Sequence, residues 1–263
     1  VVFLVLLGHA RRPRRFHLVA PADLVEQVRR AVPPICSHVD HPVGGLPTLE
    51  LDALVDLHRK PAGPFPPYDE PTYMREAQLF TEWYCPALGL DVDAAGFDAA
   101  WREVLAPLTA NQQPGVTVLR DYHAENIMLL RPDQGASEQG VIDFQDALVG
   151  HPAYDLVSLL QDARRDVSPE LEAKMLARYR EQADCGPEFD ADYARLGAQR
   201  NTKIVGIFAR LNQRDGKPRY LGMIPRVWEA LERDLAHPAL APVAQWFDAN
   251  IPAELRARHG AID

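Results

Sequence analysis

Three polar side chains near the middle of the chain have the types and spacing of a phosphoryl-transfer site. Asp121 and Asn126 lie five residues apart in a short connection, and Asp143 ends an apolar run 17 residues further on. In such sites one carboxylate accepts the proton of an attacking hydroxyl, while an Asn and a second Asp hold magnesium against the phosphates. The spacing therefore predicts Asp121 as the catalytic base. It predicts Asn126 and Asp143 as ligands of Mg2+ and, through the metal, of ATP.

Each of these residues also has an ordinary structural explanation. Asp121 could be a cap, Asn126 a turn residue, and Asp143 the end of a strand. The surrounding apolar runs favour function: the Asp121–Asn126 segment lies between β-type runs at 116–119 and 127–130. A third run, 140–142, ends at Asp143. Polar residues at strand ends are common in functional sites, so we interpret the three as one constellation.

Four neighbouring residues are weaker candidates for a role in this site. Arg120 either braces the loop by pairing with a carboxylate or is a solvated charge, and His123 is favoured as a structural residue that holds the loop. Asp146 is a possible further metal or sugar contact. Asp155 is expected to cap the helix that follows it, and from there it can also brace the catalytic loop.

The elements that must position these residues follow from apolar periodicity and breakers. Four Pro and one Gly between residues 59 and 68 indicate an extended loop, and Gly216-Lys217-Pro218 indicates a turn. Short strands within a mostly helical chain predict an α+β fold, with short hairpins at the catalytic site. The expected helices cover residues 51–58, 74–88, 97–108, 152–164, 168–183, 190–213, 223–236 and 241–249.

The chain resembles the aminoglycoside phosphotransferase and choline kinase superfamily, which has a protein-kinase-like fold. Within it, the chain is most similar to bacterial kinases that phosphorylate N-acetylmuramate and N-acetylglucosamine at the anomeric hydroxyl during cell-wall recycling. The resemblance covers residues 51–250 and implies an ATP- and Mg2+-dependent enzyme. It departs from the protein-kinase pattern, because Leu119 replaces the His before Arg-Asp and Asp143-Phe144-Gln145 replaces Asp-Phe-Gly. The strings that carry it are R-D-Y-H-A-E-N-I-M (120–128), V-I-D-F-Q-D-A (141–147), Y-D-L-V-S-L-L (154–160), L-D-A-L-V-D-L-H (51–58), P-P-Y-D (66–69), R-E-A-Q-L-F-T-E-W-Y (75–84), Q-R-N-T-K-I-V-G-I-F-A-R-L (199–211) and R-D-G-K-P-R-Y-L (214–221).

The sequence constrains the phosphoryl acceptor less than it constrains the reaction. An aminoglycoside, choline or another alcohol is therefore an alternative to the amino sugars. A polycationic aminoglycoside would need an acidic pocket near Asp121. The anionic lactyl group of muramate would need a cation such as Lys203 or Arg210. Sugar sites combine an aromatic platform with polar contacts, and the candidates for these are Trp83, Tyr84, Gln145, Asn201, Lys203 and Arg210. The helical spacing of Trp83 and Tyr84 favours core packing over a platform, and an ordinary solvated helix face is the alternative for Asn201 and Lys203.

Composition narrows the class of protein. The 263 residues, 47% apolar with a net charge of −9, suffice for one or two domains with a core. They give no basic patch for nucleic acid. Three widely spaced cysteines form no metal motif and favour a reducing, cytoplasmic compartment. Cys85 is expected to be a buried apolar side chain. The apolar run at residues 1–7 is too short to span a bilayer, so we expect a small-molecule substrate and no membrane partner.

Residues 1–50 differ from the rest of the chain. They contain six Arg and no Lys, and one helix is plausible, over 20–32. No Gly-rich phosphate loop occurs, and no Lys precedes Lys60. We interpret 1–50 as a truncated or aberrant N-terminal lobe, or a foreign segment, and 51–263 as a catalytic C-terminal lobe. An inactive remnant that cannot hold ATP is therefore the alternative to a working kinase.

Overall fold

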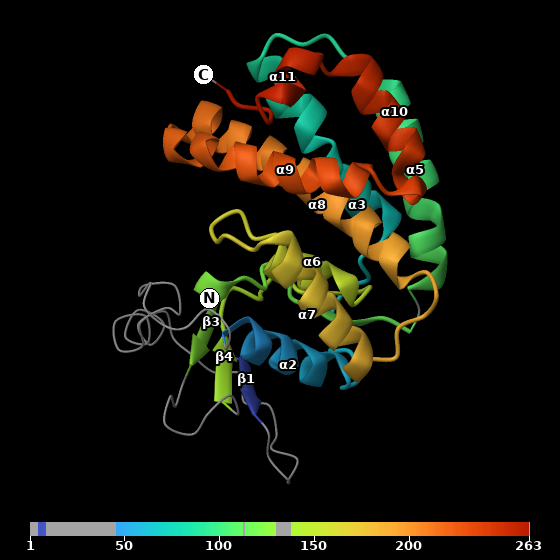
Figure 1. The fold of residues 1–263 in the computed structure, drawn as a ribbon, viewed down its shortest axis with the longest axis vertical. Coiled ribbons are helices and arrows are strands. Elements are labelled where there is room, and N and C mark those ends of the chain that lie inside the picture. Colours follow the sequence, from blue (N-terminus) through green and yellow to red (C-terminus); the bar gives the residue numbers. More distant parts are fainter. Residues whose placement is uncertain (1–4, 9–45, 113, 130–137, 263) are drawn as a thin grey trace. The chain divides into compact units, whose positions relative to one another are not determined.

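The computed structural model describes residues 5–8, 46–112, 114–129 and 138–262, which fall into two compact units (Figure 1). Unit 1 comprises Val1–Pro67, Pro114–Leu160 and Val167–Cys185, and unit 2 comprises Tyr68–Gln113, Gln161–Asp166 and Gly186–Asp263. In the described part of the chain the named strands belong to unit 1, while unit 2 is helical. The α+β class predicted from the sequence is confirmed. The helix expected over 20–32 lies outside the described residues, and the interpretation of 1–50 stays a prediction.

Unit 1 contains two small antiparallel sheets. In the first, β4 (Glu138–Val141) lies between β1 (Val5–Gly8) and β3 (Ile127–Leu129). In the second, β2 (Val116–Val118) pairs with β5 (Leu148–Gly150). The three strands predicted around the candidate site are therefore confirmed, each within two residues at either end.

Three helices support these sheets in unit 1: α2 (Leu46–His58), α6 (Ala153–Leu160) and α7 (Pro169–Gln182). Ser168 caps α7 by accepting the Leu171 N–H at 3.2 Å. Arg178 of α7 donates from Nε and Nη2 to the Asp52 carboxylate of α2, at 3.0 and 2.7 Å. At the end of α2, His58 Nδ1 lies 2.8 Å from the Tyr179 hydroxyl. Polar contacts thus connect α2 to the C-terminal part of α7.

Unit 2 is built around the 27-residue helix α8, which packs along α9 (Figure 1). Helix starts carry side-chain caps: Asp69 accepts the Thr72 N–H at 3.1 Å, and Asp93 accepts the Gly96 N–H at 2.8 Å. Gly216, at φ +64°, ends α8 in the left-handed conformation that favours glycine, as the predicted turn requires. The elements are α3 (Glu70–Ala77), η2 (Phe80–Tyr84), α4 (Cys85–Ala87), α5 (Ala94–Asn111), α8 (Phe189–Asp215), η5 (Pro218–Met223), α9 (Ile224–Leu235), η6 (Pro238–Leu240), α10 (Ala241–Asn250) and α11 (Ala253–Ala257).

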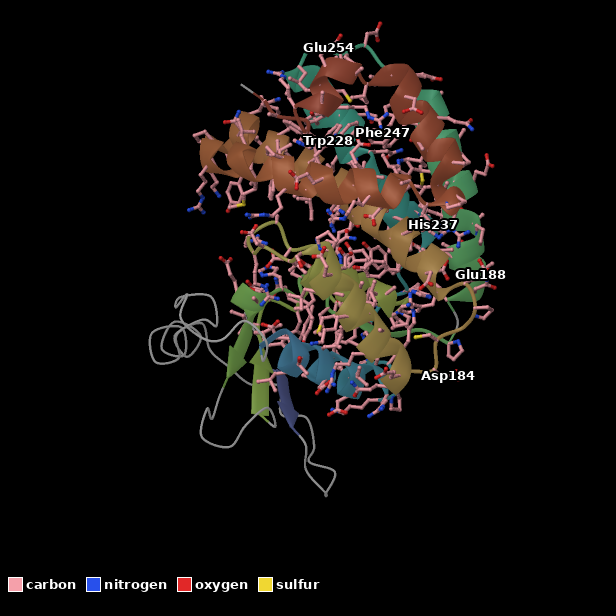
Figure 2. The ribbon with its side chains drawn as sticks, viewed as in Figure 1. Asp184, Glu188, Trp228, His237, Phe247 and Glu254 are labelled. Atoms are coloured by element: carbon pink, nitrogen blue, oxygen red, sulfur yellow. The ribbon has the colours of Figure 1, made fainter. Side chains whose placement is uncertain are left out.

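An aromatic cluster forms the core of unit 2, and it includes Trp228 and Phe247 (Figure 2). The Phe80 ring centroid lies 4.8 Å from that of Tyr84 and 5.3 Å from that of Phe247. Tyr84 is fully buried, and its hydroxyl donates to the Gly260 carbonyl at 2.7 Å. Each such ring contributes roughly 150–250 Å2 of buried area, so this cluster dominates the apolar burial between α5, α9 and α10.

One predicted helix is wrong in its form. Residues 74–88 do not make a single α-helix: α3 starts at Glu70 and stops at Ala77, and the chain passes through a π-helical turn over 80–84. Helix α8 comes very close at this point, because a Cβ on Gly206 would lie 2.3 Å from the Leu79 carbonyl carbon. Insertions of this kind depend on tertiary packing and leave the apolar pattern nearly unchanged.

Cys85 follows the π-helical turn and is fully buried and free. Burial raises the pKa of its thiol to about 12, so it is a poor nucleophile at neutral pH. The expectation that Cys85 acts as a small apolar side chain is confirmed.

Within the described residues, no helix combines the length and apolar character needed to cross a lipid bilayer.

Replacing Gly206 with Ala should destabilise the protein. Ala is the better helix former by about 1 kcal/mol, but its methyl group would collide with the Leu79 backbone, and overpacking costs about 1–3 kcal/mol. Denaturant unfolding should show a net loss of stability. Gly222→Ala is the matched control, since no atom of the described residues lies within 4 Å of the place its methyl group would take. Equal stability of both variants would contradict the close approach.

Acid should lower the stability of the fold through His58, which lies in the α2–α7 contact. Burial, with a smaller contribution from His151, lowers the pKa of His58 from 6.5 to about 3. Below pH 6.5 the unfolded chain therefore takes up a proton that the folded chain does not. The free energy of unfolding consequently decreases as the pH is lowered. The loss is at most about 1.4 kcal/mol per pH unit. Unfolding free energies between pH 7 and pH 5 should fall less steeply for His58→Gln, which does not titrate there. Parallel slopes would contradict this assignment.

Candidate active site

Strand pairing brings Asn126 and Asp143 to the same end of the β3–β4 pair. Ile127 is opposite Val141, and the Ile142 N–H donates to the Asn126 carbonyl at 3.0 Å. Asp143 is the next residue along the chain. Two residues 17 positions apart are therefore neighbours because of the register of a short hairpin.

The loop that contains Asp121 is tied to Asn126. The Asn126 side-chain Nδ2 donates to the Asp121 carbonyl at 3.0 Å and lies 3.2 Å from His123 Nε2. Asn126 and His123 are buried, whereas the Asp121 side chain is exposed. The favoured role of His123, holding the loop, is confirmed. With the Asn126 amide nitrogen engaged by the loop, its Oδ1 is the atom suited to bind a cation.

Two residues of the site have left-handed backbone conformations. Arg120 has φ 70° and Asp143 has φ 60°, and neither is glycine. Such conformations cost about 1–3 kcal/mol for a side chain like that of Arg, and they persist where the surroundings hold them. The strain lies immediately before Asp121 and at Asp143 itself.

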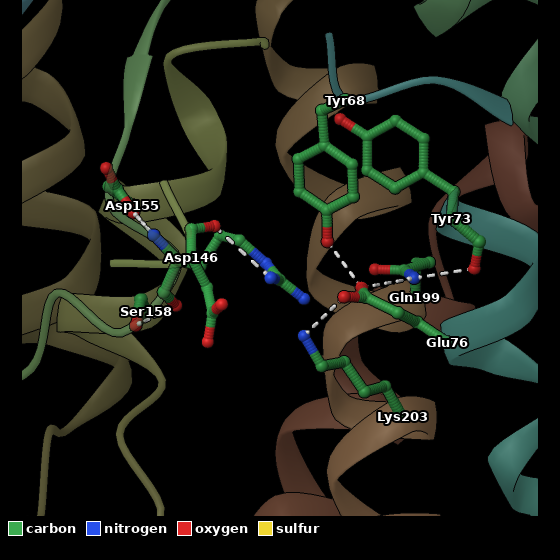
Figure 3. A network of polar contacts seen from close by, with 9 residues as sticks. Tyr68, Tyr73, Glu76, Asp146, Asp155, Ser158, Gln199 and Lys203 are labelled. Atoms are coloured by element: carbon green, nitrogen blue, oxygen red, sulfur yellow. Dashed lines mark hydrogen bonds and ion pairs between the residues drawn. The ribbon is translucent and has the colours of Figure 1, made fainter. Parts of the chain in front are cut away.

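A buried carboxylate holds the strained turn at Arg120. Asp155 accepts the backbone N–H groups of Leu119 and Arg120 at 2.6 and 2.8 Å. Ser158 donates to the Arg120 carbonyl at 3.4 Å (Figure 3). The Arg120 guanidinium donates to the Asp146 carbonyl at 3.2 Å. The bracing role predicted for Asp155 is confirmed. Arg120 itself braces the loop through a backbone carbonyl.

The expected capping role of Asp155 is wrong, because Asp155 is the third residue of α6 and not the residue before it. The helix itself therefore carries this brace. At the helix start His151 Nδ1 accepts the Ala153 N–H at 3.2 Å. The loop has a second anchor at Tyr122, whose fully buried hydroxyl donates to the Glu50 carbonyl in α2 at 2.7 Å. Burial raises the pKa of Tyr122 well above its usual value, so the hydroxyl stays a donor at every ordinary pH.

The donor set suits magnesium held jointly with a phosphate ligand. Mg2+ is commonly bound by one or two protein oxygens, with water and substrate phosphates completing its shell. Asn126 Oδ1 and the Asp143 carboxylate can supply those oxygens. Among the described residues no group of three or more His, Cys, Asp or Glu side chains could form an all-protein metal cage.

The candidates for sugar contact have different environments. Tyr84 lies in the aromatic core and cannot be an open platform, while Trp83 is half-buried. Asn201 is fully buried and donates to Gln161 at 2.7 Å and to Asp234 at 3.2 Å. Gln145 is exposed and Arg210 is half-buried. Lys203 pairs with Glu76 at 2.9 Å, a partner that sequence reasoning missed because 127 residues separate the two.

Comparison with known proteins points to one family. The model of the phosphotransferase enzyme family matches residues 51–198. A Caulobacter vibrioides protein named N-acetylmuramate/N-acetylglucosamine kinase is 42% identical over 223 residues, covering 78% of this chain and 60% of that protein. Proteins of the same name from Pseudomonas aeruginosa and Neisseria meningitidis are both 39% identical, over 77% and 70% of this chain and 62% and 57% of theirs. The chain thus spans about 60% of the length of these curated relatives.

A solved structure also aligns with the chain. It is described as a choline/ethanolamine kinase family protein from Mesorhizobium loti, with 15% sequence identity and a TM-score of 0.49, covering 77% of this chain and 66% of that one.

Asp155→Asn should loosen the turn before Asp121. An Asn side chain can offer an acceptor to only one of the two amides and would leave the other facing its NH2 group. We expect a loss of about 1–3 kcal/mol of stability and faster hydrogen exchange at Leu119 and Arg120. Asp91→Asn, at an exposed carboxylate, should change stability by less than about 0.5 kcal/mol. Unchanged exchange at both amides would contradict the brace.

Proposed function

The chain belongs to the phosphotransferase enzyme family, and we propose that it carries the catalytic residues of a kinase for amino sugars. In this proposal the γ-phosphoryl group of ATP passes to the anomeric hydroxyl of N-acetylmuramate or N-acetylglucosamine. The matched region, residues 51–198, contains Asp121, Asn126 and Asp143. Family membership also confirms the kinase-like fold expected from the sequence.

One observation carries the proposal: an exposed carboxylate follows a strained, braced turn beside two oxygen ligands. Phosphoryl transfer depends on positioning and electrostatics more than on covalent chemistry. The Asp155 brace and the Asn126 bond to the Asp121 carbonyl restrict the backbone on both sides of Asp121. A mechanism that depends on positioning requires a catalytic residue whose backbone is held in this way.

The proposed roles follow from the chemistry of each group. Asp121 accepts the proton of the sugar hydroxyl while the hydroxyl oxygen forms a bond to the γ-phosphorus of ATP. The bond between the γ-phosphorus and the oxygen that bridges it to the β-phosphate breaks, and ADP is released. Asn126 and Asp143 hold the cation. Bound Mg2+ would neutralise phosphate charge as the transfer proceeds.

The choice of acceptor in this proposal rests on the names of the relatives. The sequences of those relatives extend beyond the part that this chain matches. N-acetylmuramate and N-acetylglucosamine are the substrates in those names. Phosphorylation of these sugars would serve the recycling of peptidoglycan, and ATP makes the cytoplasm the expected location.

A test compares magnesium-dependent ATP consumption by the wild type and by Asp121→Ala with each amino sugar. Loss of a positioned general base typically costs about 10²–10⁴-fold in rate, so the variant should lose nearly all turnover. Asp143→Asn should require more magnesium, and Asp91→Asn should match the wild type. Choline and an aminoglycoside complete the acceptor panel.

The outcomes separate the alternatives. Turnover with choline or an aminoglycoside and with neither sugar would replace the proposed acceptor. Turnover that survives in Asp121→Ala would remove that residue from the chemistry. No turnover together with no nucleotide binding by calorimetry would support the rival function, a kinase-like protein that does not hold ATP.

A further inference from the structure

Arg120 carries a long side chain at a backbone position that favours glycine. Its φ is 70°, in the left-handed region, where a residue with a Cβ is strained and glycine is not. The bonds from Asp155 hold this turn through backbone amides, and a glycine at position 120 would supply the same amide. The presence of Arg at a strained position therefore indicates that its side chain has a role that glycine could not fill.

The Arg120 side chain contacts the segment that begins at Asp143. We call residues 143–147 the Asp143 turn. The Arg120 guanidinium donates from Nη1 to the carbonyl of Asp146 in this turn, at 3.2 Å (Figure 3). A charged donor makes a stronger hydrogen bond than a neutral one. The side chain thus connects the residue before the proposed base to the turn that starts at a proposed cation ligand.

Strand pairing fixes the two ends of the Asp143 turn. Just before its start, the Ile142 N–H donates to the Asn126 carbonyl at 3.0 Å. Just after its end, Leu148 pairs with the last residue of β2. The chain reaches Arg120 two residues beyond β2, so Arg120 and the turn meet at the same end of the β2–β5 sheet. Asp146 is exposed between the two fixed ends, and the Arg120 bond holds the turn there.

We propose that Arg120 is a positioning residue, which couples the placement of Asp143 to that of Asp121 by holding the Asp143 turn against the loop of the base. This inference rests on the proposed function, in which Asp121 is the base and Asp143 a cation ligand. Phosphoryl transfer needs the acceptor hydroxyl and the metal-bound phosphate in one fixed geometry. A bond from the neighbour of the base to the turn of the ligand restricts the separation of the two carboxylates.

The test separates the side chain of Arg120 from its backbone. Arg120→Gly removes the guanidinium and the strain, Arg120→Ala removes only the guanidinium, and Arg120→Lys keeps both the strain and a charged donor. Calorimetry of the whole chain with ADP and Mg2+ measures affinity, and urea unfolding measures stability. Affinity should follow the donor, with Arg tightest, Lys intermediate, and Ala and Gly equally weak, about fivefold or more below the wild type. Stability should follow the backbone, so Arg120→Gly should be more stable than Arg120→Ala.

A purely structural role for Arg120 predicts a different order. Affinity would then follow stability, and Arg120→Gly would bind ADP and Mg2+ more tightly than Arg120→Ala and nearly as tightly as the wild type. That result would overturn the proposal. Arg102→Gly is the matched control, because it removes an exposed Arg from helix α5. It should lower stability, since Gly is a poor helix former, and leave the affinity unchanged.

Hydrogen exchange tests the coupling without any ligand. Arg120→Gly should speed exchange of the Ala147 amide, which donates to the Phe144 carbonyl at 3.0 Å within the Asp143 turn. The Leu119 amide, which Asp155 holds, should keep its wild-type rate. Unchanged exchange at Ala147 would overturn the coupling by itself. A wild type that binds no ADP in the presence of Mg2+ would instead contradict the proposed function, and the exchange rates would still decide whether Arg120 holds the turn.

Discussion

The hydrogen bonds from Asp155 to two consecutive backbone amides are the interaction on which the candidate site depends. A buried carboxylate needs donors, and here the donors are the amides at the end of β2. The same bonds hold Arg120 in a left-handed conformation that it would not adopt unaided. The result is a sharp turn from which the Asp121 side chain emerges into solvent. The hydrogen bonds that the buried Asp155 carboxylate needs thereby offset the conformational strain at Arg120.

Asn126 connects this turn to the strands. Its side chain binds the Asp121 carbonyl, while its own carbonyl accepts the N–H of Ile142, the residue before Asp143. The loop and the hairpin therefore behave as one piece, since displacement of either would break a bond at Asn126. In a reaction governed by the placement of charges, such a shared residue limits the relative motion of base and cation ligands.

Sequence patterns predicted what depends on local spacing. The strands around the site and helix α7, expected over 168–183 and found over Pro169–Gln182, follow from apolar periodicity and caps. The π-helical turn at 80–84 and the Glu76–Lys203 pair were not predicted. Each of these depends on contacts between segments far apart in the chain, for which a single sequence gives no signal. The roles of Asp121, Asn126 and Asp143 stay predictions, although the structure gathers all three around one loop and one hairpin.

The pairing of Ile127 with Val141 also limits how this sequence can diverge. Exchange of one apolar residue for another along β3 or β4 keeps the register. Insertion or deletion of a single residue within either strand would not, because side chains alternate between faces and a one-residue slip reverses them. The hydrogen bond that joins Asn126 to Ile142, the residue before Asp143, would then be lost. Among descendants of this sequence these strands should therefore drift freely in composition and hardly at all in length.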